Sequence, residues 1–137
     1  MASLHLEVVT PRGVVVNKDI DEVTVPGTLG DFGILAGHIP VLSALRTGLM
    51  SYRSGNAVEH LALGGSGYAE VGAHDRVMVL TDESATSDDV DTDAVRAELE
   101  EAESELQHFE GDPQGADYTL LRQRADWARA RLDLAGK

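Results

Sequence analysis

The sequence predicts an N-terminal antiparallel β-sandwich followed by a C-terminal antiparallel helical hairpin, a β + α architecture. Short β-rich segments separated by turn residues fill the first 85 residues. Apolar residues recur at helical spacing in the last 50. The net charge changes at the same place, from −5 over residues 1–85 to −10 over 86–115 and +2 over 116–137. We therefore place the sandwich at 1–85 and the hairpin at 86–137.

The N-terminal segments have the pattern of half-buried strands. Leu4, Leu6 and Val8 alternate with His5 and Glu7, a period of two that predicts one buried and one exposed face. Further β-rich runs end at Gly, Pro, Asn, Asp or Ser, and they cover residues 14–16, 20–25, 49–53, 57–63, 68–71 and 76–81. Many short strands with no helical run between them are typical of a sandwich or barrel.

Two heptad-like apolar stripes predict the two helices. The first stripe is Val95, Leu99, Ala102, Leu106 and Phe109, and the second is Tyr118, Leu121, Ala125, Ala128 and Leu132. Residues 111–115 contain Gly and Pro and break the pattern, so the helices become antiparallel neighbours. We expect Thr92 or Asp93 to cap the first helix and Asp117 to cap the second.

Charge within the hairpin favours a weak closure. Glu98, Glu101 and Glu105 repel one another at spacings of three and four residues. Arginines of the second helix can relieve this repulsion across the seam, although exposed pairs contribute only about 0–1 kcal/mol each. Two interpretations follow: a marginally stable hairpin that opens onto a partner, or a permanently closed hairpin with solvated outer faces.

Composition excludes several classes of function. With 24 acidic and 11 basic residues the net charge is −13, which disfavours binding to nucleic acids and to anionic lipid surfaces. The absence of cysteine excludes disulfides and thiolate zinc sites. No window approaches ~18 consecutive apolar residues, so we expect no direct membrane insertion. The first residues lack the pattern of a signal peptide.

No catalytic or metal-binding motif stands out. The five histidines are too far apart in sequence for ligand-type spacing, which predicts no metal site. The segment 64–68 lacks the second glycine of a nucleophile elbow, and no phosphate-binding loop is present. We therefore expect a chain with no catalytic residues, not an enzyme by itself, and rank a sandwich-based hydrolase last.

Glycine and proline recur among buried-type side chains in residues 25–40. Such a concentration of special backbone positions favours a loop held in one shape and used for contact, with His38 exposed on it. A crowded β-corner is the structural alternative.

This region also carries a family resemblance. Residues 23–40, V-T-V-P-G-T-L-G-D-F-G-I-L-A-G-H-I-P, resemble the signature of the epsilon subunit of F-type ATP synthases, with Ala36 where the family commonly has proline. Residues 66–71 and 77–85 resemble two further segments of that family, in the same order along the chain. The resemblance therefore extends over essentially the whole sequence.

The resemblance implies a non-catalytic central-stalk (rotor) subunit of a proton-translocating ATP synthase. Such a subunit binds the gamma subunit, rests on the c-subunit ring, couples rotation to ATP synthesis, and inhibits ATP hydrolysis when its helices extend against the alpha/beta catalytic subunits. It implies a peripheral location on the cytoplasmic face of the inner (plasma) membrane. Gly37 and His38 then become candidates for the c-ring interface. The candidates for contact with the beta subunit are Arg122, Arg124, Arg129 and Arg131.

Some bacterial members of this family bind ATP on the closed hairpin, which makes ATP a possible regulatory ligand and leaves no other cofactor implied. The matching positions are Asp93, Arg96 and Arg131, although Trp127 stands where the family has another arginine. The alternative function is a free-standing nucleotide-sensing module whose hairpin closes on its ligand. The structural alternative is that Asp93 caps the helix and Arg96 is solvated.

Overall fold

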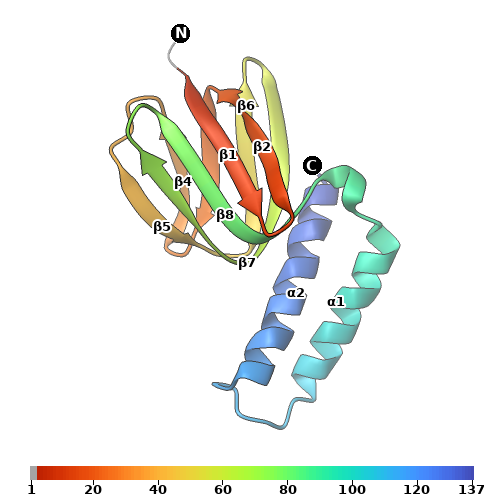
Figure 1. The fold of residues 1–137 in the computed structure, drawn as a ribbon. Helices are drawn as coiled ribbons and strands as arrows, with labels where there is room; N and C mark the ends of the chain where they lie inside the picture. Colours follow the sequence, from red (N-terminus) through yellow and green to blue (C-terminus); the bar gives the residue numbers. More distant parts are fainter. Residues whose placement is uncertain (1–2) are drawn as a thin grey trace.

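The computed structural model describes residues 3–137, and it confirms the predicted fold class: a β-sandwich with a helical hairpin at one end (Figure 1). The elements in chain order are β1 (Leu4–Thr10), β2 (Gly13–Ile20), β3 (Glu22–Gly27), β4 (Gly30–Leu35), β5 (Val41–Leu45), β6 (Gly48–Ser54), β7 (Ala57–Gly72), β8 (Arg76–Ala85), a short 3₁₀ turn η1 (Ser87–Asp89), α1 (Thr92–Gln107) and α2 (Ala116–Ala135).

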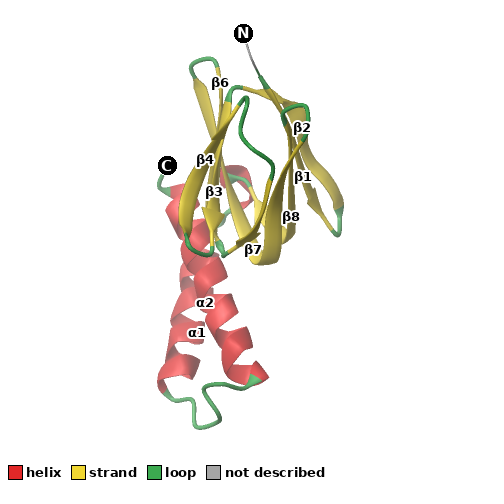
Figure 2. Ribbon diagram, turned by 90° about the vertical axis from the view of Figure 1, so that its left-hand side faces the viewer, coloured by secondary structure: helices red, strands yellow, loops and turns green. Residues whose placement is uncertain are grey.

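The strands pair in the order β2-β1-β8-β7-β5-β3-β4, and β6 pairs with both β3 and β7. β1 and β8 run parallel, and the other pairs are antiparallel. Figure 2 shows the resulting two layers, with β3, β4 and β6 in one and β1, β2 and β8 in the other. The sandwich therefore has two outer faces. The hairpin lies against the end of the sandwich formed by β6 and β7.

β7 belongs to both layers. Its first half pairs with β6 and its second half with β5, and its register with β8 shifts between Gly64 and Gly67. An irregularity of this kind bends a strand and increases its twist. The sequence pattern predicted two separate strands here, 57–63 and 68–71, because the glycines at the bend interrupt the apolar pattern of one continuous strand.

The core between the layers is aliphatic. The alternation predicted for β1 is confirmed, since Leu4, Leu6 and Val8 are fully buried whereas His5 and Glu7 are partly exposed. Each fully buried aliphatic side chain of this size contributes about 1.5–3 kcal/mol. The other core residues are Val16, Ile20, Val23, Val25, Ile34, Leu45, Met50, Tyr52, Leu61, Leu63, Ala69, Val71, Val77 and Val79.

The predicted contact loop at residues 25–40 is wrong for most of its length. β3 continues to Gly27, and β4 follows after a two-residue turn, with Gly27 paired to Gly30. Gly30 has φ 133°, a conformation that favours glycine, so this residue marks a tight hairpin turn rather than a long loop. The β-corner alternative describes this segment, and only residues 36–40 form a loop between strands.

The predicted helical seam is present. Val95, Ala102, Ala125 and Ala128 are buried along it, and the rings of Phe109 and Tyr118 pack at its tip with centroids 5.2 Å apart. The larger seam residues Leu99, Leu106, Leu121 and Leu132 are only partly buried. The closed seam is therefore narrow and rich in alanine.

The predicted helix caps are wrong. Asp91 precedes α1 with extended backbone, and its side chain accepts a hydrogen bond from the Ala94 N–H at 3.3 Å. α2 begins after Gly115, which provides no capping side chain. Thr92, Asp93 and Asp117 lie inside the first turns, where they have helical backbone and cannot occupy the cap position.

α2 carries a second apolar stripe that the sequence analysis missed. Ala130 and Leu134 are buried against Ala62 and Ala85 of the sandwich, with Trp127 partly buried beside them. α2 is thus the helix that packs on β6 and β7, while α1 packs on α2 (Figure 1). Within residues 3–137, no helix has the combination of length and hydropathy required to cross a membrane.

The His5 ring joins β1 to β2 and provides a test of this pairing. Its Nδ1 donates to Asp19 at 2.8 Å and its Nε2 to Asn17 at 2.6 Å, so both bonds form together only in the imidazolium. These bonds, led by the one to Asp19, raise the pKa of His5 above its ordinary 6.5. Because the folded-state pKa is raised, the stabilisation is present below the unfolded pKa and is lost as the pH rises through the folded value.

We expect an NMR titration of His5 to give a pKa above 6.5, and we expect Asp19→Asn to lower that pKa. A His5 pKa that is unchanged by Asp19→Asn contradicts the role assigned to the Asp19 bond.

Candidate functional site

The outer face of the layer formed by β1, β5, β7 and β8 is unusually apolar. Cross-strand partners place Ala44 beside Tyr68, Tyr68 beside Leu80, and Leu80 beside Val9. A second row brings Leu42 and Met78 to either side of Glu70. We call this set the apolar face; it consists of Val9, Leu42, Ala44, Tyr68, Met78 and Leu80.

Several of these side chains are open to solvent. Leu42 is 64% exposed, Tyr68 44% and Met78 38%. Scattered exposed apolar residues are normal on a soluble protein, but a set that adjoins across four strands is typical of an interaction surface. Glu70 lies between Leu42 and Met78, and Glu7 lies on the other side of Met78, so the second row alternates apolar and acidic residues.

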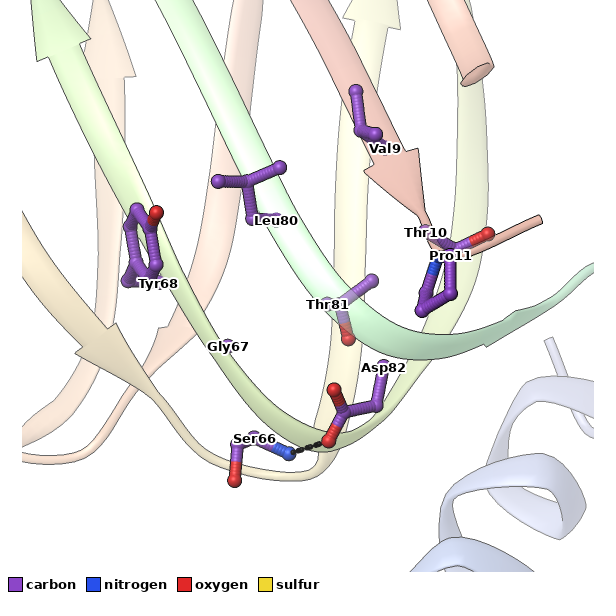
Figure 3. Close-up of a pocket in the computed structure, with 9 residues that line it drawn as sticks. All are labelled: Val9, Thr10, Pro11, Ser66, Gly67, Tyr68, Leu80, Thr81 and Asp82. Atoms are coloured by element: carbon purple, nitrogen blue, oxygen red, sulfur yellow. Dashed lines mark hydrogen bonds between the residues drawn. The ribbon is translucent and has the colours of Figure 1, made fainter. Parts of the chain in front are cut away.

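A pocket of about 370 Å³ lies at one end of the apolar face (Figure 3). Gly67 forms part of its wall, where a Cβ would come within 2.4 Å of the Leu80 carbonyl oxygen. The lining residues are Val9, Thr10, Pro11, Ser66, Gly67, Tyr68, Leu80, Thr81 and Asp82. This mostly apolar lining suits a protruding side chain of another protein.

The Asp82 carboxylate and the Thr81 hydroxyl of the pocket are engaged within the protein. The Asp82 carboxylate accepts a hydrogen bond from the Ser66 N–H at 2.8 Å, and the Thr81 hydroxyl donates to the Gly64 carbonyl at 3.1 Å. Ser66 lies on the bent part of β7 with no helix after it, which differs from a nucleophile elbow. The pocket is therefore arranged for contact rather than for nucleophilic chemistry.

Asp75 fixes the loop that contains Gly37 and His38. Its carboxylate accepts a hydrogen bond from the Gly37 N–H at 2.7 Å, and its carbonyl accepts one from the His5 N–H at 2.8 Å. His74 and Asp75 both have positive φ, 61° and 57°, which is uncommon for residues other than glycine. The turn between β7 and β8 thus holds the loop in place.

His38 is half-buried rather than exposed as the sequence predicted, and its Nδ1 bonds to the Ile39 carbonyl at 2.7 Å. The residue that projects from this loop is Ile39, which is 73% exposed. Sequence analysis missed Ile39 because an isoleucine is normally expected to be buried in the core. The apolar face could have been found from the unbroken apolar run Val77–Leu80. Apolar residues on both faces of a strand indicate that each face packs against something, one against the core and the other against a further surface.

Three of the four candidate arginines on α2 form ion pairs within the hairpin. Arg124 pairs with Glu105 of α1 at 3.0 Å, Arg131 pairs with Glu98 of α1, and Arg129 pairs with Asp126 on its own helix. Among the described residues, Arg122 has no ion-pair partner within 4.0 Å. The two cross-helix pairs bring positive charge to the acidic face of α1, as the sequence analysis expected.

Two of the candidate nucleotide-binding residues pair with each other, and the third, Arg131, has other partners. Asp93 pairs with Arg96 on the exposed side of α1 at 3.7 Å, whereas Arg131 pairs with Glu98 and lies against the Trp127 ring. A cavity of about 440 Å³ is lined by Glu83, Glu98, Arg124, Trp127 and Arg131, and neither Asp93 nor Arg96 lines it. In the described part of the chain, no group of three or more His, Asp or Glu residues is placed to hold a metal ion.

Comparison with known proteins gives one consistent result. Residues 3–87 match the family described as "ATP synthase, Delta/Epsilon chain, beta-sandwich domain". The chain is 40% identical over 134 residues to "ATP synthase epsilon chain 2" of Syntrophotalea carbinolica, covering 98% of this chain and 94% of that protein. It is 34% identical to "ATP synthase epsilon chain" of Geobacter sulfurreducens, with the same coverage.

Solved structures show the same fold at lower identity. A chain in the Euglena gracilis mitochondrial ATP synthase assembly of OSCP, F1 and c-ring matches with a TM-score of 0.82 at 20% identity, covering 100% of this chain and 83% of that one. A chain in the central stalk and c-ring of the Tetrahymena thermophila mitochondrial ATP synthase matches with a TM-score of 0.63 at 17% identity, covering 96% of each chain.

Proposed function

The chain belongs to the family of ATP synthase epsilon chains, and we propose that it acts as the non-catalytic central-stalk subunit of a proton-translocating F-type ATP synthase. In this role it couples rotation of the stalk to ATP synthesis. The observation that carries the proposal is the apolar face, whose exposed side chains suit a lasting contact with another subunit. A location at the cytoplasmic face of the inner (plasma) membrane follows from the complex, with the chain peripheral to it.

We assign three partners to three surfaces. The gamma subunit takes the apolar face and its pocket, the c-subunit ring takes the loop of residues 36–40, and the alpha/beta catalytic subunits take the hairpin. For the c-ring contact, we add Ile39 to Gly37 and His38, because the Ile39 side chain is apolar and largely exposed. The rigid hold of Asp75 on Gly37 supports a contact surface at this loop.

We also propose that the hairpin inhibits ATP hydrolysis. The cross-helix pair Arg124–Glu105 is exposed on both sides, and a pair of this kind contributes about 0–1 kcal/mol and weakens with salt, whereas the Arg131 side chain of the second pair is largely buried. Carboxylates on another subunit can therefore exchange with Glu98 and Glu105 as partners of Arg131 and Arg124. Guanidinium groups suit such an exchange, because their planar donors match carboxylates well.

To test the gamma assignment, we replace Tyr68 by Glu in the middle of the apolar face. A charge buried at an aromatic contact costs about 2 kcal/mol or more. We therefore expect the affinity for gamma to fall by at least about thirtyfold and co-purification to weaken. Val58→Glu is the matched control, since Val58 is also on β7 and 52% exposed but lies outside the apolar face. Equal binding by the two variants contradicts the assignment.

To test the hairpin, we remove residues 86–137 and measure ATP hydrolysis by the assembled complex. We expect gamma binding to persist and hydrolysis to rise. Replacement of Arg122, Arg124, Arg129 and Arg131 by Ala should shift hydrolysis in the same direction, and the four corresponding Lys variants should retain more inhibition because they keep the charge. Hydrolysis that is unchanged by both the truncation and the alanine set rules out inhibition by this hairpin.

The nucleotide-sensing alternative predicts that the isolated chain binds ATP through Asp93, Arg96 and Arg131. Calorimetric titration of the isolated chain distinguishes the two functions. We expect no saturable heat up to millimolar ATP, because Asp93 and Arg96 pair with each other and lie outside the cavity that Arg131 lines. Saturable heat that is lost in Arg131→Ala supports the sensor.

A further inference from the structure

The hairpin meets the sandwich through an indole placed directly on a glycine. A Cβ built on Gly64 of β7 would lie 2.4 Å from Cε3 of Trp127 and 2.8 Å from Cδ2, closer than side chains can approach. The φ of Gly64 is outside the left-handed region, so its backbone does not call for glycine. The space taken by the indole therefore accounts for glycine at this position.

Arg131 holds the same indole from within α2. Its guanidinium carbon lies 5.1 Å from the ring centroid, and its Nε donates to the Trp127 carbonyl at 3.3 Å. Its Nη2 donates to Glu98 of α1. The Arg131 side chain is only 18% exposed, against 51% for Arg124. One continuous set of contacts thus joins β7, α2 and α1.

The rest of the contact between the helix and the sandwich is small. Ala62, Ala85 and Ala130 contribute little area each, Leu134 is the one large side chain fully buried with them, and Leu49 and Val90 are partly buried against the cluster. Trp127 is the largest side chain of the cluster, and aromatic residues dominate the energetics of such contacts. The indole on Gly64 therefore carries a large share of the docking.

We propose that Trp127, seated on Gly64 and clamped by Arg131 and Glu98, is a latch that holds the hairpin on the sandwich without a bound ligand. Undocking of α2 requires the indole to leave Gly64. The latch is a property of the isolated chain, so it stands or fails independently of whether the hairpin inhibits hydrolysis.

The test uses the full chain with Gly64→Ala, which places a methyl group where the indole sits. Overpacking of this kind should lower the ratio of docked to undocked hairpin by about tenfold or more. Gly72→Ala is the matched control on the same strand, because its Cβ would have nothing closer than 3.9 Å. Glu98→Gln, which loosens the clamp, should lower the ratio less than Gly64→Ala does.

Two measurements report whether the hairpin is docked on the sandwich. Trp127 is the only tryptophan, so its emission maximum and its quenching by acrylamide report the seat directly. Because the sequence has no cysteine, Asn56→Cys and Gln114→Cys introduce one spin label on the sandwich and one at the hairpin tip for distance measurement. We expect Gly64→Ala to shift emission to the red and to broaden the label distances, and Gly72→Ala to change neither.

A Gly64→Ala protein with native circular dichroism and unchanged label distances overturns the proposal. If Gly64→Ala does not fold, Trp127→Leu with the same labels decides the question, since it removes the indole and adds no atoms at β7. Broadened label distances in Trp127→Leu support the latch, and wild-type distances overturn it.

Discussion

The bend in β7 sets the positions of both sandwich layers, of the apolar pocket and of the hairpin. This strand pairs with β5, β6 and β8, and it changes layers where its register shifts between Gly64 and Gly67. Gly67, at one end of the bend, lines the apolar pocket. Gly64, at the other end, contacts the indole of Trp127. Because both positions leave no room for a side chain, one short segment provides both a wall of the apolar pocket and the contact site of the hairpin.

The two parts of the molecule are stabilised by different means. The sandwich encloses fully buried aliphatic side chains such as Leu6, Val25 and Val79, which makes it rigid. The hairpin relies on an alanine-rich seam and on ion pairs that water and salt can reach. Under the proposed function, a hairpin that moves breaks contacts that are separate from those that hold the sandwich together.

The fold was predictable from local patterns, and the errors have clear physical causes. The alternation in β1 and the stripe containing Val95 and Ala102 each follow from burial of one face, which sequence periodicity reports directly. The β4 strand was missed because its turn glycines resemble those of a loop. α1 begins at Thr92, which is one or two residues earlier than a cap at Thr92 or Asp93 implies. The apolar face and the contact of Trp127 with Gly64 bring together residues that are far apart in the sequence. Local sequence patterns do not show which strands pair, so they did not predict either feature. Asp93 and Arg131 were grouped by family pattern, and their side chains pair elsewhere.

The docking of α2 rather than α1 has a mechanical consequence. The sandwich, α2 and α1 are connected in series, with Trp127 as the first joint and the Arg131–Glu98 pair as the second. Residues 86–91 also join β8 covalently to α1, so a load applied to α1 tests the two joints only as packing contacts, and the weaker contact separates first. Failure at the second joint separates the helices and leaves α2 in place, whereas failure at the first frees the hairpin as a single rigid arm.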